Sequence, residues 1–139
     1  MRQIPGSLLW VGHAGEARQS HEVLGSGIAA VVDLAIEEPA ANLIRELIYC
    51  RLPLDDGPGN PLWLLRATIE TVATLLCADV PILVACGAGM SRSLYIAGAA
   101  ITLVRGCSAD EGLAIAIGTG PARADISPAL WAEVRAVFA

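Results

Sequence analysis

The chain has 139 residues, a length typical of one domain with a single substantial core, so we expect residues 1–139 to form one domain. No uninterrupted apolar run approaches the roughly 18 residues of a membrane-spanning helix, and the amino terminus lacks a signal-peptide pattern. The formal net charge is −5 and the nine basic residues, all arginines, are scattered, which argues against nucleic acid or a membrane as a partner. We therefore expect a cytoplasmic protein.

The first 52 residues alternate between strand and helix patterns. A short apolar run predicts a strand at residues 8–11, and helical spacing predicts a helix over 14–24. The β-branched run at 28–34 is typical of a buried strand. A short helix at 40–46 and another strand at 47–52 are expected to follow.

The cysteines and histidines show neither a Cys-x-x-Cys pair nor the spacing of metal ligands; they are Cys50, Cys77, Cys86, Cys107, His13 and His21. We therefore predict no zinc site. Both histidines are interpreted as surface or helix-capping residues. In a reducing compartment the thiols are expected to stay free.

A polar loop follows the strand at 47–52. Asp55 and Asp56 precede Gly57, Pro58 and Gly59, a pattern typical of a hinged surface loop, and catalytic groups are common on such loops. A carboxylic acid in that place can give a proton to a leaving oxygen. The simpler interpretation of either aspartate is a solvated turn carboxylate.

The next segment reads as helix, strand, tight loop and helix. Helical spacing predicts a core-facing helix over 61–77, in which we expect Trp63 to pack. The apolar run at 81–85 predicts a buried strand that ends at Cys86. Residues 87–91 are small and Gly-rich, and a helical pattern begins directly after them.

This strand-loop-helix arrangement predicts an anion site. The N–H groups of a Gly-rich loop and of a helix N-terminus attract a phosphate dianion, and a guanidinium binds two of its oxygens. The expected phosphate-binding residues are Gly87, Ala88, Gly89, Met90, Ser91 and Arg92. The same groups stabilise a thiolate, so Cys86 is predicted to titrate well below about 8.5 and to act as a nucleophile. The alternative is a buried free cysteine at the end of a core strand.

Three helices complete the chain. The apolar pattern over 92–104 places that helix at the centre of the domain. Ser108 caps the next helix, which ends at Gly118, and the last helix begins near Ser127. Strands separated by helices predict a three-layer α/β domain with a central, mostly parallel sheet flanked by helices.

Four residues carry a resemblance to a known family. Cys86, Gly89, Arg92 and Ser93 match the Cys-x-x-Gly-x-x-Arg-Ser signature of the cysteine-dependent protein phosphatases, in the form typical of dual-specificity phosphatases. Phrases near both ends of the chain also resemble this family, so the resemblance covers nearly the whole chain. It implies a protein tyrosine phosphatase-like fold, a phosphocysteine intermediate and no metal or other cofactor. The implied substrates are phosphorylated proteins or small phosphoesters.

The resemblance also implies a role for each site residue. Cys86 is the nucleophile, Arg92 binds the phosphoryl oxygens, and Ser93 helps Cys86 to leave. The phrase Leu-Pro-Leu-Asp-Asp at 52–56 aligns Asp56 with the family's general acid. Asp55 stays open as the alternative, because a shift of one residue exchanges the two. Some relatives protect the nucleophile with a reversible disulfide, for which Cys50 is the candidate here.

The chain departs from the family at Ala85, where the family has a histidine before the nucleophile. The loss of that side chain predicts a less depressed pKa for Cys86 and slower turnover near neutral pH. The short chain predicts a shallow site that admits phosphoserine and phosphothreonine as well as phosphotyrosine. Two other functions stay open: a phosphatase-like domain that binds phosphorylated partners without hydrolysing them, and a rhodanese-type sulfurtransferase.

Overall fold

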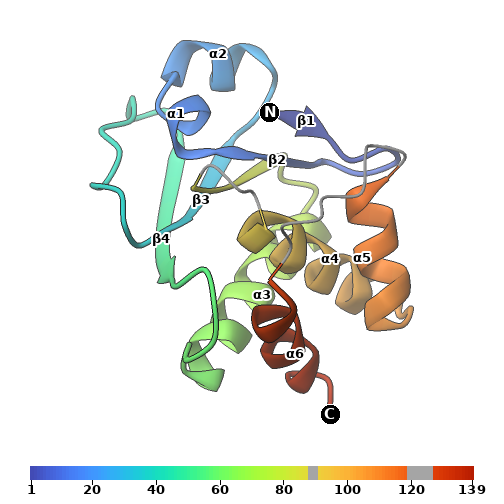
Figure 1. Cartoon of the computed structure of the whole chain (residues 1–139). Coiled ribbons are helices and arrows are strands. Elements are labelled where there is room, and N and C mark those ends of the chain that lie inside the picture. The colour runs from blue at the N-terminus through green and yellow to red at the C-terminus, as the bar shows by residue number, and fades with distance from the viewer. Residues whose placement is uncertain (88–90, 119–126) are drawn as a thin grey trace.

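A computed structural model of the chain describes residues 1–87, 91–118 and 127–139, and it contains a five-stranded sheet (Figure 1). The strands are β1 (Arg2–Gln3), β2 (Leu9–His13), β3 (Ala30–Ala35), β4 (Ile48–Leu54) and β5 (Ile82–Cys86). Their order across the sheet is β1-β2-β5-β3-β4. All neighbouring pairs are parallel except β1 with β2, so the prediction of a mostly parallel sheet is confirmed.

Helices cover both faces of this sheet. They are α1 (Ala14–Ala17), α2 (Ser20–Gly25), α3 (Leu62–Cys77), α4 (Ser91–Arg105), α5 (Ala109–Ile117) and α6 (Pro128–Ala136). In Figure 1, α1 and α2 lie on one side of the sheet, and the four longer helices lie on the other. This is the predicted three-layer α/β architecture. None of the described helices is both long and apolar enough to span a membrane.

Two apolar clusters fill the space on either side of the sheet. Val32, Val84 and Cys86 belong to the larger cluster, together with residues of α3 and α4. Leu83 and Ala85 belong to the smaller cluster, which also contains residues of α1 and α2. Because successive side chains of a strand point to opposite faces, Cys86 and Ala85 face different layers. Strands buried on both faces also explain the continuous apolar runs in the sequence.

The central position predicted for α4 is confirmed, since each of its residues from Ser91 to Thr102 is buried. Two glycines permit close contact between α4 and α5. A Cβ on Gly98 would lie 2.8 Å from the Cα of Leu113, and a Cβ on Gly112 would collide with the carbonyl oxygen of Gly98. The N-terminus of α4 is therefore presented by a helix that is packed along most of its length.

The expected strands are all present, with ends shifted by one or two residues, but three other expectations are wrong. The helix expected over 14–24 is two short helices, with Arg18 at the C-cap of the first. Residues 40–46 are not helical, because the N–H groups of Ala41 and Ile44 donate to side-chain hydroxyls instead of to helix carbonyls. Trp63 does not pack in the core and is 69% exposed.

Candidate active site

The candidate site lies where three neighbouring parallel strands end, which is the usual binding edge of an open α/β sheet. β5 ends at Cys86, β4 leads into the loop that carries Asp55 and Asp56, and β3 leads into the loop that carries Glu37. Arg92 comes from the buried N-terminal turn of α4. Residues from four segments of the chain therefore converge at one edge.

Cys86 is buried beside Ser93, as the resemblance implied. Its side chain is 1% exposed, and its sulfur lies 3.3 Å from the Oγ of Ser93. The backbone N–H of Ser93 also donates to the sulfur, at 3.4 Å. A hydroxyl and an amide of the α4 N-terminus are thus in place to stabilise negative charge on this sulfur.

The pKa of the Cys86 thiol is nevertheless raised above its ordinary value. Burial raises it, and this effect outweighs the hydrogen bonds from Ser93 and the positive charge of Arg92, which lower it; the carboxylate of Asp56 raises it further. The expectation of a depressed pKa is therefore wrong for this structure. The physical reason is the burial of the sulfur, which disfavours the charged thiolate more than Ser93 and Arg92 favour it.

Arg92 is held in a fixed orientation by three oxygens. Its Nη1 donates to the carbonyl oxygens of Leu54 at 2.8 Å and Leu34 at 3.4 Å, and its Nη2 donates to Oε2 of Glu37 at 2.7 Å. The hydrogen bond from Arg92 lowers the pKa of Glu37, so this pair is charged at neutral pH. The Nε of Arg92 is buried without a hydrogen-bond partner among the described residues.

A buried guanidinium N–H without a partner is costly unless a ligand completes it. Arg92 is only 2% exposed, so solvent does not readily replace that ligand. The adjoining Gly87 leaves space beside the guanidinium, because a Cβ there would lie 2.7 Å from Nη2 of Arg92. This arrangement suits an anion with two or more oxygens, as predicted for phosphate. Of the predicted phosphate-binding residues, Ala88, Gly89 and Met90 lie outside the described residues.

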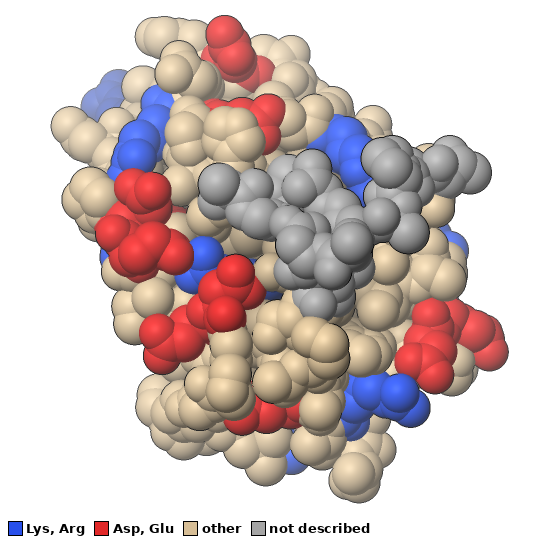
Figure 2. Space-filling model, in the orientation of Figure 1, with Lys and Arg blue, Asp and Glu red and all other residues tan. Residues whose placement is uncertain are grey.

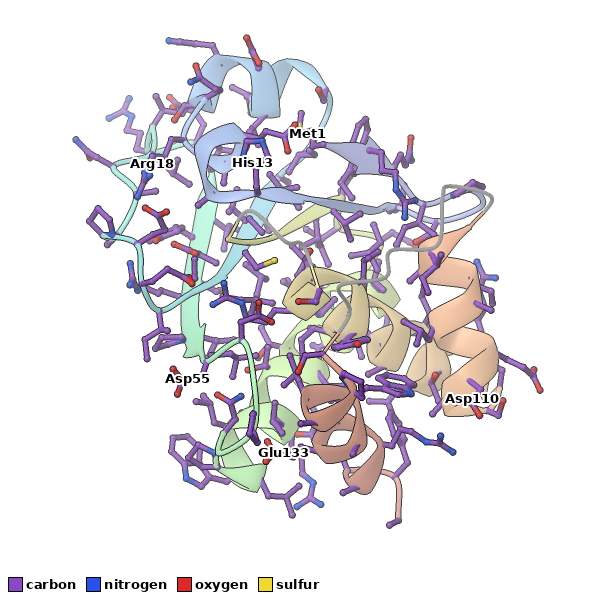
Figure 3. All side chains as sticks on the ribbon, in the orientation of Figure 1. Met1, His13, Arg18, Asp55, Asp110 and Glu133 are labelled. Atoms are coloured by element: carbon purple, nitrogen blue, oxygen red, sulfur yellow. The ribbon has the colours of Figure 1, made fainter. Side chains whose placement is uncertain are left out.

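The two candidate acids have different surroundings. Oδ1 of Asp56 accepts a hydrogen bond from Oγ of Ser91, the first residue of α4, at 2.7 Å. Both aspartates are exposed, and in Figure 3 the side chain of Asp55 points toward the outer edge of the molecule. The structure therefore brings Asp56 into contact with the first residue of α4.

Two further residues brace the loop that carries these acids, and neither was predicted from the sequence. Asn60 is buried; its Oδ1 accepts from the N–H of Asp55 at 2.8 Å, and its Nδ2 donates to the carbonyl oxygens of Asp55 and Gly57. Glu133 of α6 accepts from the N–H of Gly59 at 2.7 Å. The Asp-Gly-Pro-Gly-Asn pattern at 56–60 was the available signal for the first brace, because Asn side chains often hydrogen-bond nearby backbone groups in turns.

Ala85 is fully buried in the apolar cluster beneath α1 and α2. It lies opposite Asp33 in the parallel register of β3 and β5. The carboxylate of Asp33 accepts hydrogen bonds from the hydroxyl of Tyr49 and from the N–H of Ala35. The position before the nucleophile is thus apolar, and its nearest carboxylate already has partners.

The remaining cysteine and histidine predictions have separate outcomes. Cys50 lies opposite Val32 on β4, and β3 separates β4 from β5. Two strand spacings are about 10 Å, which exceeds the roughly 7 Å limit between the Cα atoms of a disulfide, so a bridge to Cys86 does not fit.

His13 caps α1 by accepting from the N–H of Glu16, as expected. No group of three or more metal-ligating side chains occurs in the described ranges.

The chain shares its fold with known protein structures. No family model matches the sequence, and no curated protein matches it. Solved structures do match. Human DUSP28 is 22% identical with a TM-score of 0.79, and the match covers 95% of this chain and 92% of that one. A mouse putative dual specificity phosphatase complexed with zinc tungstate is 22% identical with a TM-score of 0.78, over 94% and 81%.

A third similar structure is human tyrosine phosphatase-like serine/threonine/tyrosine-interacting protein. It is 21% identical with a TM-score of 0.75, and the match covers 98% of this chain and 93% of that one. The chain therefore has the fold of the dual-specificity and tyrosine phosphatases, and the protein tyrosine phosphatase-like architecture that the sequence predicted is confirmed.

Proposed function

We propose that this protein is a cysteine-dependent phosphatase that hydrolyses phosphotyrosine esters, and phosphoserine and phosphothreonine esters as well, through a phosphocysteine intermediate. The observation that carries the proposal is the contact of Asp56 with Ser91, because it places a carboxyl group beside the loop between the buried Cys86 and Arg92. A nucleophile, an anion-binding cation and a proton donor are then within one site.

The first step transfers the phosphoryl group to the enzyme. The thiol of Cys86 first releases its proton to solvent. The resulting thiolate forms a bond to phosphorus while the bond from phosphorus to the ester oxygen breaks, and protonated Asp56 gives its proton to that oxygen. The equatorial oxygens are held by the Nε and Nη2 groups of Arg92 and by loop N–H groups. Burial of the site strengthens these interactions, since little water competes with them.

The second step returns the enzyme to its starting state. Asp56, now ionised, takes a proton from a water molecule whose oxygen attacks phosphorus, and the sulfur–phosphorus bond breaks. The hydroxyl of Ser93, 3.3 Å from the sulfur, donates a hydrogen bond to the departing thiolate. The second step regenerates the thiolate of Cys86 and the protonated form of Asp56, and neither step requires a metal or another cofactor.

The phosphatase-like binding module remains the second candidate, and the raised pKa of Cys86 favours it. A protonated thiol is a poor nucleophile, and Ala85 contributes no charge or hydrogen bond that favours the thiolate. Such a protein would still bind a phosphorylated partner through Arg92. The two functions differ in whether the bound ester is cleaved.

Hydrolysis of p-nitrophenyl phosphate by the wild type and three variants separates the candidates. We expect Cys86→Ser to abolish turnover and Asp56→Asn to lower kcat by roughly 10²- to 10⁴-fold, the range for general acid catalysis. Asp55→Asn is the matched control and should stay within about threefold, because its side chain is directed away from the site.

A second substrate sharpens this test. Phenyl phosphate has a poorer leaving group, so Asp56→Asn should slow it more than it slows the nitrophenyl ester. A wild type no faster than Cys86→Ser, but with measurable binding of a phosphopeptide, would support the binding module. Transfer of sulfur from thiosulfate to cyanide by the wild type would indicate a sulfurtransferase. Equal losses in Asp55→Asn and Asp56→Asn would refute the assignment of the acid.

A further inference from the structure

A pocket lies beside the phosphate-binding loop and is not used by the proposed reaction. It has a volume of about 210 Å³, and its lining residues are His13, Ala14, Gly15, Glu38 and Gly87. Gly87 directly follows Cys86 in the chain, so the pocket begins where the anion site begins. Its volume is below the roughly 300–1,000 Å³ of sites that enclose a whole small ligand, and it suits one side chain.

The interior of the neighbouring anion site is positive and its surroundings are negative. Arg92 is buried, and its Nε has no partner among the described residues, which points to an anionic ligand at the centre. The carboxylates on the surrounding loops are those of Glu37, Glu38, Asp55 and Asp56. Figure 2 shows acidic side chains gathered on the left of this face, where the labelled Asp55 of Figure 3 also lies.

The arginines described nearest to this rim already have partners. Arg18 lies 3.5 Å from Oε2 of Glu38, and it also donates to the carbonyl oxygen of Pro39. Arg51 donates to the carbonyl oxygens of Ala35 and Glu38. The side chains of Arg18 and Glu38 are each more than one-third exposed, and ion pairs of this kind are weak. A cation of a ligand can therefore bind the Glu38 carboxylate beside Arg18 or in its place.

We propose that this pocket is a subsite for an arginine or lysine that flanks the phosphorylated residue of a protein substrate. The inference rests on the proposed phosphatase function, and it names the class of substrate for that same site. In such a substrate the phosphate dianion lies at Arg92 and the flanking cation lies at Glu38. These two charges are opposite in sign to the charges of the protein that they meet. Nucleotides and phosphoinositides place additional negative charge at the acidic rim, so they are disfavoured.

The test uses three phosphotyrosine peptides that differ only in two flanking residues, which are arginines, glutamines or glutamates. We expect kcat/KM to fall in that order, with a factor of about two to five for each charge pair that forms at an exposed site. The difference between the peptides should shrink as the salt concentration is raised from about 0.05 to about 0.3 M. Equal rates for the three peptides, or a preference for glutamates, would overturn the inference.

Variants locate the preference in the pocket. Glu38→Gln should reduce the advantage of the arginine peptide by at least about twofold, whereas Arg18→Gln should increase it by leaving Glu38 without its partner. Asp110→Asn is the matched control: it removes an equal charge on α5, at the right-hand edge of the molecule in Figure 3 and opposite Asp55, and should leave the advantage unchanged. Damage to the fold alone would lower the rates for all peptides together. An unchanged advantage in Glu38→Gln would refute the assignment of the pocket.

Binding distinguishes failure of this inference from failure of the proposed function. The Cys86→Ser variant cannot form the phosphocysteine, so the Kd of each peptide is measured with it by fluorescence anisotropy. A tighter Kd for the arginine peptide supports the subsite even if the wild type hydrolyses nothing. An active wild type, tested on an aryl phosphate, with no difference in Kd between the peptides refutes the subsite and leaves the phosphatase function standing.

Discussion

Replacement of Glu37 by glutamine tests the role of the ion pair that holds Arg92. The amide keeps an oxygen that can accept the hydrogen bond from Arg92, so the change mainly removes charge. At the observed 2.7 Å, Coulomb attraction is about 6 kcal/mol at an effective dielectric of 20 and about 1.5 kcal/mol in water. The Glu37 side chain is 49% exposed, so screening brings the expected loss of stability to about 1–2 kcal/mol.

The assay is equilibrium unfolding in denaturant, with Glu38→Gln as the matched control. Glu38 pairs with Arg18 at 3.5 Å on the surface, so its replacement should cost less than about 0.5 kcal/mol. The folded-state pKa of Glu37 is lowered, so its contribution is present above its ordinary pKa of about 4.3 and is lost as the pH falls through the lowered value. Equal losses in the two variants at neutral pH would refute the view that Glu37 balances a buried cation.

Three other predictions concern the helix contact, the thiol and the acid loop. Gly112→Ala should destabilise the fold by about 2 kcal/mol, because its Cβ would meet the backbone of α4, whereas Gly25→Ala, with nothing within 4 Å, should be neutral or stabilising in thermal unfolding. Alkylation of Cys86 by iodoacetamide should still accelerate as the pH rises past about 8.5, since its pKa is raised; a plateau below neutral pH would contradict this. Asn60→Ala removes hydrogen bonds to three backbone groups, and we expect a loss of about 1–3 kcal/mol together with a lower kcat; an unchanged kcat would show that the brace does not position Asp56.

The sequence was sufficient for the layers of the fold and for the strand and helix that flank the candidate site. Most residues of the apolar runs at 28–34 and 81–85 are buried, and the helix after Cys86 is buried along most of its length, so the pattern of apolar residues predicted both kinds of element. The edge strand β1 was missed because Arg2–Gln3 is too short to show any periodicity. The segment at 40–46 was misread because side chains from outside the segment, Tyr49 and Ser20, take the hydrogen bonds that a helix would form.

The parts of the site that the sequence did not predict depend on long-range contacts. Glu37 lies 55 residues from Arg92 in the chain, and no local pattern links them. The pKa of Cys86 depends on a balance between burial and charge, and the motif specifies only the charge. The preference for Asp56 over Asp55 likewise depends on a long-range contact, the hydrogen bond from Ser91 to Asp56, since the two aspartates differ by one position in the chain.

The hydrogen bonds of Arg92 to the carbonyl oxygens of Leu34 and Leu54 also have a mechanical consequence. They tie the ends of two strands to the start of α4, so any hinge in the acid loop must lie beyond Leu54. Asn60, buried at the other end, holds the backbone of Asp55 and Gly57, so the acid loop is limited to residues 55–59. The reach of Asp56 is then set by a short span with two fixed ends, and insertion of a single residue there would misplace the acid without disturbing the cation that binds the phosphate.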